Sequence, residues 1–208
     1  MSARFHLTPD GAKPCSATQR QCPLGGTHYS TLGEAQAVFE EGQETFQKSS
    51  KKSNLPQIET SVLMKPMGSG NYLGANIPNH EVDAYLQAWE DLVGKDAAAA
   101  MSATKAARDR GYHYHLTTVG PPEMRKMGGL HQNPFPQMYK VDFEGLGKVE
   151  EEGNEAWFIV CSSPELTRWR TERGLPPKDF HITLGFTEKD IHNQSKGSER
   201  IIVSAASS

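Results

Sequence analysis

The sequence contains no long hydrophobic run. Over its 208 residues no stretch approaches the roughly 18 consecutive apolar residues that a membrane-spanning helix needs. The first residues, which include Arg4 and His6, also lack the apolar core of a secretory signal. These absences argue against a membrane protein, and we expect a cytoplasmic protein without a membrane partner.

Cysteine is scarce, and neither sign of charge is in strong excess. Three cysteines, a small and odd number, do not form a disulfide framework, and Cys161 lies in an apolar run where we expect a buried thiol. The formal net charge is −3, whereas a protein that grips long nucleic acid usually clusters Lys and Arg against several phosphates. The balance favours a small or local phosphate ligand, although a locally basic cleft on an acidic molecule can still attract RNA.

What the sequence does have is a regular succession of apolar patterns. Apolar residues recur every three or four positions over 82–93, before Gly94, which predicts an amphipathic helix. A second helix is predicted at 97–110 and a third directly after Ser163, whose side chain can cap it. Alternating or β-branched runs predict strands at residues 58–64, 72–77, 112–119, 139–143, 156–161 and 180–186.

These patterns divide the chain into three parts. We predict a turn-rich extension with a helix and a polar linker at residues 1–54, a main domain at 55–203 and a small polar tail at 204–208. Within the main domain the order strand, helix, strand with histidine occurs twice, which predicts two similar lobes. After the first histidine strand, Gly120 and two prolines are interpreted as the start of a loop that reaches Gln137 and selects the substrate.

One short pattern, an aromatic residue, histidine, an apolar residue and threonine, occurs three times. With 8 histidines and 13 threonines, chance placement gives about half of one His-x-Thr pair, before any apolar context is required. The occurrences are Phe5-His6-Leu7-Thr8, Tyr114-His115-Leu116-Thr117 and Phe180-His181-Ile182-Thr183. The first leads directly into a turn and precedes the linker, so we interpret His6 as structural. His115 and His181 are therefore the candidate pair.

The His-x-Thr spacing suits phosphodiester cleavage. On a strand, residues two apart point to the same face, so the imidazole and hydroxyl of each motif share one pocket while their neighbours pack behind the strand. Cleavage needs a base for the entering oxygen, an acid for the leaving oxygen and donors for the nonbridging oxygens. Histidine serves both proton roles because its unperturbed pKa is about 6.5. We predict His115 and His181 as catalytic residues, with Thr117 and Thr183 as ligands of the substrate phosphate.

Several residues outside the two motifs are interpreted as having no part in catalysis. His113 shares a face with His115 and is interpreted as a rim residue, and His192 is interpreted as a surface residue. A base could stack on Tyr112 or Tyr139, but the core is the commoner place for a strand tyrosine. Three basic residues after the second motif are interpreted as solvated charges: Lys189, Lys196 and Arg200.

The N-terminal part contains side chains that ligate zinc elsewhere. Cys15, Cys22 and His28, with or without His6, could form a small metal site, but their spacing matches no paired Cys-x-x-Cys knuckle. We favour a turn-rich hairpin over that alternative, and the prediction includes no metal.

The paired motifs resemble those of the two-histidine (2H) phosphoesterase superfamily, which includes bacterial RNA 2′,3′-cyclic phosphodiesterases, RNA-end exonucleases and phage enzymes that degrade cyclic nucleotide signals. The resemblance covers residues 55–203 and is greatest from Gly174 to Phe186. It implies a bilobal α+β fold in which two antiparallel sheets face a central cleft, with helices outside. It also implies catalysis without a metal or other cofactor, one histidine acting as base and the other as acid. We assign the base to His115 and the acid to His181.

The sequence thus predicts a metal-independent hydrolase that acts on a 2′,3′-cyclic phosphate or phosphodiester of a nucleotide, an RNA end or a cyclic oligonucleotide. No obligate protein partner is predicted. Two alternatives stay open: a nucleotide-binding module that sequesters its ligand in the same cleft, and an interaction protein whose N-terminal part carries the function. The presence of two such histidines favours catalysis, because a pure binder could use Lys or Arg in their place.

Overall fold

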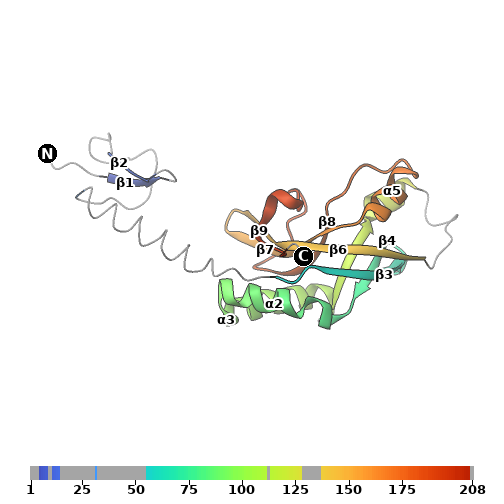
Figure 1. Cartoon of the computed structure of the whole chain (residues 1–208), viewed down its shortest axis with the longest axis horizontal. Helices are drawn as coiled ribbons and strands as arrows, with labels where there is room; N and C mark the ends of the chain where they lie inside the picture. The colour runs from blue at the N-terminus through green and yellow to red at the C-terminus, as the bar shows by residue number, and fades with distance from the viewer. Residues whose placement is uncertain are drawn as a thin grey trace. The chain divides into compact units, whose positions relative to one another are not determined.

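The computed structural model describes residues 5–8, 11–14, 31, 55–111, 113–127 and 137–206. The chain forms two compact units, residues 1–52 and 53–208. In the first unit, β1 (Phe5–Thr8) pairs antiparallel with β2 (Gly11–Pro14), and this pairing places His6 opposite Lys13 (Figure 1). Three expectations lie outside the described residues: the helix and linker before residue 55, the zinc alternative at Cys15, Cys22 and His28, and most of the loop that ends at Gln137.

The described strands of the second unit form one antiparallel sheet in the order β3-β4-β5-β8-β7-β6-β9 (Figure 1). Their bounds are β3 (Ile58–Met67), β4 (Tyr72–Ile77), β5 (Tyr114–Val119), β6 (Gln137–Glu151), β7 (Asn154–Ser162), β8 (Phe180–Phe186) and β9 (Ile201–Ser204). β3 also pairs with β6, from Ile58 opposite Phe143 to Met64 opposite Gln137. The strands from β3 to β6 in this order therefore form a closed ring of hydrogen-bonded neighbours.

The prediction of an α+β fold of the 2H phosphoesterase type is confirmed. The two sheets that we expected are joined into one by hydrogen bonding: β3, β4 and β5 form one half, and β8, β7, β6 and β9 form the other. The halves meet where Leu116 of β5 lies opposite Ile182 of β8, and again where β3 pairs with β6. The two histidine strands are thus neighbours at a junction between the halves.

Helices are found at α2 (Asn79–Val93), α3 (Lys95–Asp109), α4 (Pro121–Lys126) and α5 (Pro164–Thr171), with a short 3-10 helix, η1 (Ser198–Arg200). The helices predicted at 82–93, at 97–110 and after Ser163 are confirmed. The Ser163 hydroxyl accepts a hydrogen bond from the Leu166 N–H at 3.2 Å, as a cap should. None of the described helices combines the length and the apolar character that a membrane crossing requires.

Two predictions of local structure were wrong. The segment after β5 is the short helix α4 and not the start of a loop, because proline at the first helical positions needs no N–H partner and the Glu123 carboxylate accepts from the Gly120 N–H at 2.9 Å. β6 continues through Glu151, well beyond the predicted end at residue 143. The turn that follows is limited to Glu152 and Gly153, which both have positive φ.

The core lies between the sheet and the helices α2 and α3. Tyr85 and Trp89 of α2 are 0% and 1% exposed, and the Trp89 ring lies 6.4 Å from that of Trp157 on β7. Gly185 of β8 allows this close approach, because a Cβ there would lie 2.5 Å from the Trp89 ring and 3.0 Å from the Met101 carbonyl oxygen. The β8 strand is therefore held firmly from behind.

A buried arginine ties three segments of the second unit together. Arg170 of α5 is 1% exposed, and its guanidinium donates to the Thr118 carbonyl of β5 at 2.5 Å and to the Pro176 carbonyl at 2.6 Å. It also forms an ion pair of 2.6 Å with Glu123 of α4. The planar guanidinium can satisfy all of these acceptors at once, which a lysine could not.

We expect Arg170→Met to lower the free energy of unfolding by about 3 kcal/mol, because it leaves two carbonyl oxygens and the half-buried Glu123 carboxylate without their donor. Urea unfolding measures the effect. Arg168→Met makes the same substitution at an exposed position of the same helix and should cost less than about 0.5 kcal/mol. Equal losses in the two variants would contradict the role given to Arg170.

Candidate active site

The two His-x-Thr motifs lie on adjacent antiparallel strands. Because Leu116 is paired with Ile182, His115 lies opposite Thr183 and Thr117 lies opposite His181. Leu116 and Ile182 are both 0% exposed and point into the core. The histidines and threonines occupy the other face of the same two strands.

All four predicted site residues, His115, Thr117, His181 and Thr183, line one cleft with a volume of about 840 Å³. The sequence predicted that they would share a pocket, and the register of β5 and β8 brings them together in this way. Other residues that line the cleft and bear on its chemistry are Tyr72, Arg108, Asp109, Lys178, Asp190 and Lys196.

The structure agrees with some of the interpretations of residues outside the two motifs and contradicts one. His113 is exposed and lies outside the residues that line the cleft, whereas His192 is exposed and does line it. Tyr139 is 6% exposed and belongs to the core, as expected for a strand tyrosine. Tyr112 lies outside the described residues. The interpretation of Lys196 as a solvated charge was wrong, because only 3% of its side chain is exposed.

The orientation of His181 is set by the backbone before β8. Its Nδ1 lies 3.1 Å from the carbonyl oxygen of Asp179. A carbonyl oxygen only accepts, so Nδ1 carries the hydrogen and Nε2 of the neutral ring keeps its lone pair. The Phe158 ring lies edge-on to the imidazole, with 5.8 Å between the ring centroids. Burial, and after it the positive charge of Lys196, lowers the pKa of His181 to about 4.

His115 has different electrostatic surroundings. Burial lowers its pKa as well, but the first opposing influence is the carboxylate of Asp109, which raises it. The Tyr72 ring is tilted against the imidazole at a centroid distance of 6.0 Å. The charge that acts most strongly on His115 is therefore negative, whereas the one that acts most strongly on His181 is positive.

A network of charged side chains forms the wall of the cleft beside Thr183. Asp190 lies 2.6 Å from the Lys196 ammonium and 3.0 Å from the Arg108 guanidinium. The Thr183 hydroxyl points to the same carboxylate at 3.4 Å. Burial alone would raise the pKa of Asp190, but Lys196 and Arg108 lower it to about 2.

The network continues onto helix α3. Arg108 also binds Asp109 at 2.7 Å, and Lys105 binds the second oxygen of Asp109 at 3.0 Å. Three cations, Lys105, Arg108 and Lys196, are thus arranged around two carboxylates. The network thus has one more cation than carboxylates, and Arg108 and Lys196 line the cleft whereas Lys105 does not.

Comparison with known proteins agrees with this geometry. A family model described as "Swiss Army Knife, 2H phosphoesterase domain" (2H-SAK) matches residues 82–192, a span that includes both motifs. The chain belongs to the 2H phosphoesterases. No curated protein and no solved structure gives a significant match. Membership of the family indicates phosphoesterase activity, that is, a hydrolase.

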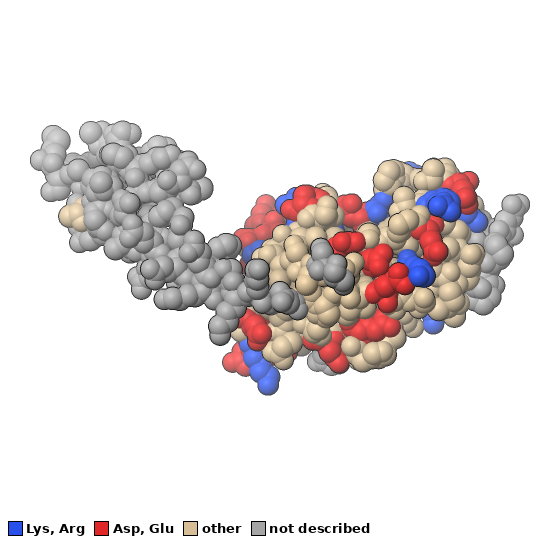
Figure 2. All heavy atoms as spheres, viewed as in Figure 1, with Lys and Arg blue, Asp and Glu red and all other residues tan. Residues whose placement is uncertain are grey.

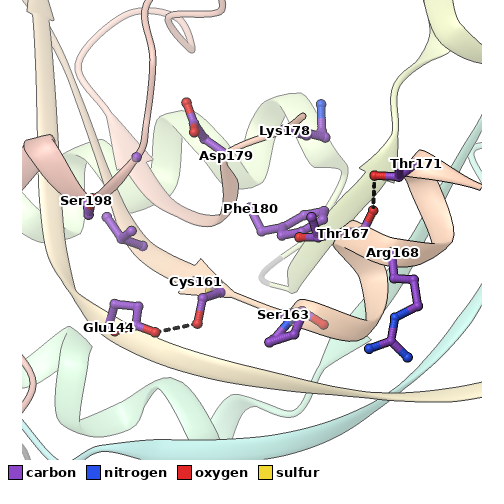
Figure 3. Close-up of a pocket in the computed structure, with 14 residues that line it drawn as sticks. Glu144, Cys161, Ser163, Thr167, Arg168, Thr171, Lys178, Asp179, Phe180 and Ser198 are labelled. Atoms are coloured by element: carbon purple, nitrogen blue, oxygen red, sulfur yellow. Dashed lines mark hydrogen bonds between the residues drawn. The ribbon is translucent and has the colours of Figure 1, made fainter. Parts of the chain in front are cut away.

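This 2H phosphoesterase has a second pocket of about 630 Å³ next to the cleft, and Lys178 and Asp179 line both. Figure 3 shows these two residues on one side of the second pocket and Cys161 and Ser163 on the other. Cys161 is 6% exposed, so the prediction of a buried thiol is confirmed, and burial raises its pKa well above the ordinary value. None of the described residues that line this pocket is a histidine, in contrast to the cleft.

The outer surface differs from the cleft wall. Figure 2 shows one face of the phosphoesterase unit, on which acidic and basic side chains are interspersed without a continuous basic area. Inside the cleft, the cations Arg108 and Lys196 are instead gathered around Asp190. Such a local group of cations on an acidic molecule can attract an anionic ligand.

The pKa of His181 makes the stability of this 2H phosphoesterase depend on pH. Between about pH 6.5 and about pH 4 the unfolded chain binds a proton that the folded protein does not, so the free energy of unfolding falls as the pH falls through this range. His181→Gln removes this titrating group, because glutamine binds no proton in this pH range. Between about pH 7 and about pH 5, we expect the wild-type protein to lose about 1 kcal/mol more than the variant in urea unfolding. Identical losses would contradict the assigned pKa.

Proposed function

We propose that this 2H phosphoesterase hydrolyses a 2′,3′-cyclic phosphate or another phosphodiester of a nucleotide, an RNA end or a cyclic oligonucleotide by acid-base catalysis with two histidines and without a metal. One observation carries the proposal: Leu116 is paired with Ile182, and this pairing presents two imidazoles and two threonines to one cleft. These groups match the needs of an in-line displacement at phosphorus.

The surroundings of the two histidines favour different proton roles. His181 is a neutral ring with a free Nε2 lone pair, and Lys196 disfavours its protonation, so it accepts the proton of the attacking water. Asp109 favours protonation of His115, and an anionic substrate adds to that effect, so His115 donates a proton to the leaving oxygen. This assignment is the reverse of the one made from the sequence. Opposite electrostatic influences on two titratable groups are a general basis for such assignments.

The threonines complete the proposed mechanism. Thr117 and Thr183 lie on the same two strands as the histidines, and their hydroxyls donate to the nonbridging oxygens, where negative charge grows during the attack. The contact of Thr183 with Asp190 is long, at 3.4 Å, so its hydrogen turns to a phosphate oxygen at little cost.

The first test is hydrolysis, in excess EDTA, of 2′,3′-cyclic mononucleotides, RNA ending in a cyclic phosphate, and cyclic oligonucleotides. We expect His115→Ala and His181→Ala each to lower kcat about a hundredfold or more, because each removes one proton transfer. His80→Ala, at an exposed position of α2, is the control and should retain full activity. Tight binding of these compounds without any product would contradict the proposal and indicate a sequestering module.

A nucleoside substrate also predicts a role for Tyr72, the aromatic side chain beside His115 in the cleft. Stacking of a base on an aromatic ring contributes about 1–3 kcal/mol, so Tyr72→Leu should raise KM for a cyclic nucleotide roughly tenfold with little change in kcat. Tyr72→Phe keeps the ring and should resemble the wild type. If Tyr72→Leu leaves KM unchanged, the base is not bound by this wall of the cleft.

A further inference from the structure

Lys196 occupies an unusual position for a lysine. It lies in the segment after β8, its side chain is 3% exposed, and it nevertheless lines the cleft. Its ammonium lies 2.6 Å from the carboxylate of Asp190 and 5.4 Å from the centre of the Phe158 ring. Taking an ammonium out of water costs several kcal/mol, which only close compensating charges can offset.

The compensation that Lys196 receives is shared. Asp190 also binds Arg108, so two cations divide one buried carboxylate. Asp109 neutralises part of the Arg108 charge but also binds Lys105. The network as a whole keeps one positive charge in excess, at a wall that borders the cleft. An anion in the cleft would balance that charge.

The position of this charge relative to the two motifs is defined by two contacts. The Phe158 ring contacts both Lys196 and the imidazole of His181, which is 5.8 Å away between ring centroids. The Asp190 carboxylate that holds Lys196 also accepts from the Thr183 hydroxyl. Lys196 therefore stands beside the histidine and the threonine of the second motif.

We propose that Lys196 binds the phosphate of the substrate beside His181 and Thr183, and that Asp190 is the positioning residue that holds Lys196 there. The inference rests on the proposed function, since it names a further residue of the same cleft. Its ligand is the negatively charged phosphodiester group itself, independent of the base.

The same charge has a consequence for the protonation of His181. Three charged groups act on this imidazole: Lys178 from the segment before β8, and Asp190 and Lys196 from the segment after it. Asp179 acts through its backbone carbonyl, which accepts from Nδ1 and raises the pKa. Arg108 of α3 reaches the group through Asp190. Among these charges, Lys196 has the largest effect on the pKa of His181, which it lowers. When its charge is removed, the opposing effect of Asp190 remains and the pKa rises.

The test compares Lys196→Met with Lys196→Arg in the full-length protein. We expect Lys196→Met to lower kcat/KM at least about tenfold and to move the acidic limb of its pH profile upward by about one unit, because a like charge next to the imidazole is lost. Lys196→Arg keeps the charge, so its kcat/KM and the position of its acidic limb should be close to those of the wild type. Lys189→Met, at an exposed lysine of the same segment, should change neither.

Two results would overturn the proposal. One is a loss of activity in Lys196→Met without any shift of the acidic limb, which indicates a structural role alone. The other is a failure of Lys196→Arg to restore activity although it folds, as judged by circular dichroism. If Lys196→Met does not fold, Lys196→Gln takes its place with the same expected results.

A binding measurement separates this proposal from the proposed function. If the wild-type protein turns over none of the substrates, the proposed function fails, and inorganic phosphate then serves as the probe. Phosphate is then titrated while the NMR signals of His181 are followed. Lys196 still holds the phosphate if the wild type binds phosphate and Lys196→Met binds it with at least about tenfold lower affinity. Equal phosphate binding by the two proteins overturns the proposal.

Discussion

The pairing of Leu116 with Ile182 is the constraint on which the candidate active cleft depends. Side chains alternate along a strand, so this one register places two apolar residues in the core and four polar ones on the opposite face. A slip of one residue would turn both histidines into the core and both apolar residues into the cleft. The burial of Leu116 and Ile182 therefore selects the register, and the register in turn brings together the groups proposed for catalysis.

Burial gives the second motif its chemical character. His181 is oriented by a backbone carbonyl and contacts Phe158, and its burial, followed by the charge of Lys196, disfavours its protonation. The first motif lies closer to the carboxylate of Asp109. Two motifs that are nearly identical in sequence thus differ in their electrostatic surroundings, because the strongest charge acting on His115 is negative and the strongest acting on His181 is positive.

The sequence was sufficient for the parts of the structure that are local. The amphipathic helices, the Ser163 cap and the two histidine strands follow from patterns of a few residues, and so does the alternation that puts His115 and Thr117 on one face. The pairing of β3 with β6 joins segments that are far apart in the chain, and nothing in either segment specifies its partner. For the same reason the single sheet could not be predicted from strands considered one at a time.

The charged network was missed for a related reason. Lys196 and Asp190 lie in a polar segment that has the composition of a solvated loop, and Arg108 lies 82 positions before Asp190 in the chain. Their contact with one another becomes apparent only when α3 packs against β8, which in turn needs a glycine at position 185. A lysine in the polar segment after a His-x-Thr strand is the one signal that the sequence offers, but the sequence alone does not distinguish Lys196 from Lys189.

The contacts of Arg170 join two segments that line the cleft. Its guanidinium binds Glu123 and the carbonyl of Pro176, and Glu123 and Pro177 line the cleft. These two parts of the cleft wall are therefore connected through one buried, planar group when the protein folds. A ligand need not order this part of the wall, so little of its binding energy is lost there.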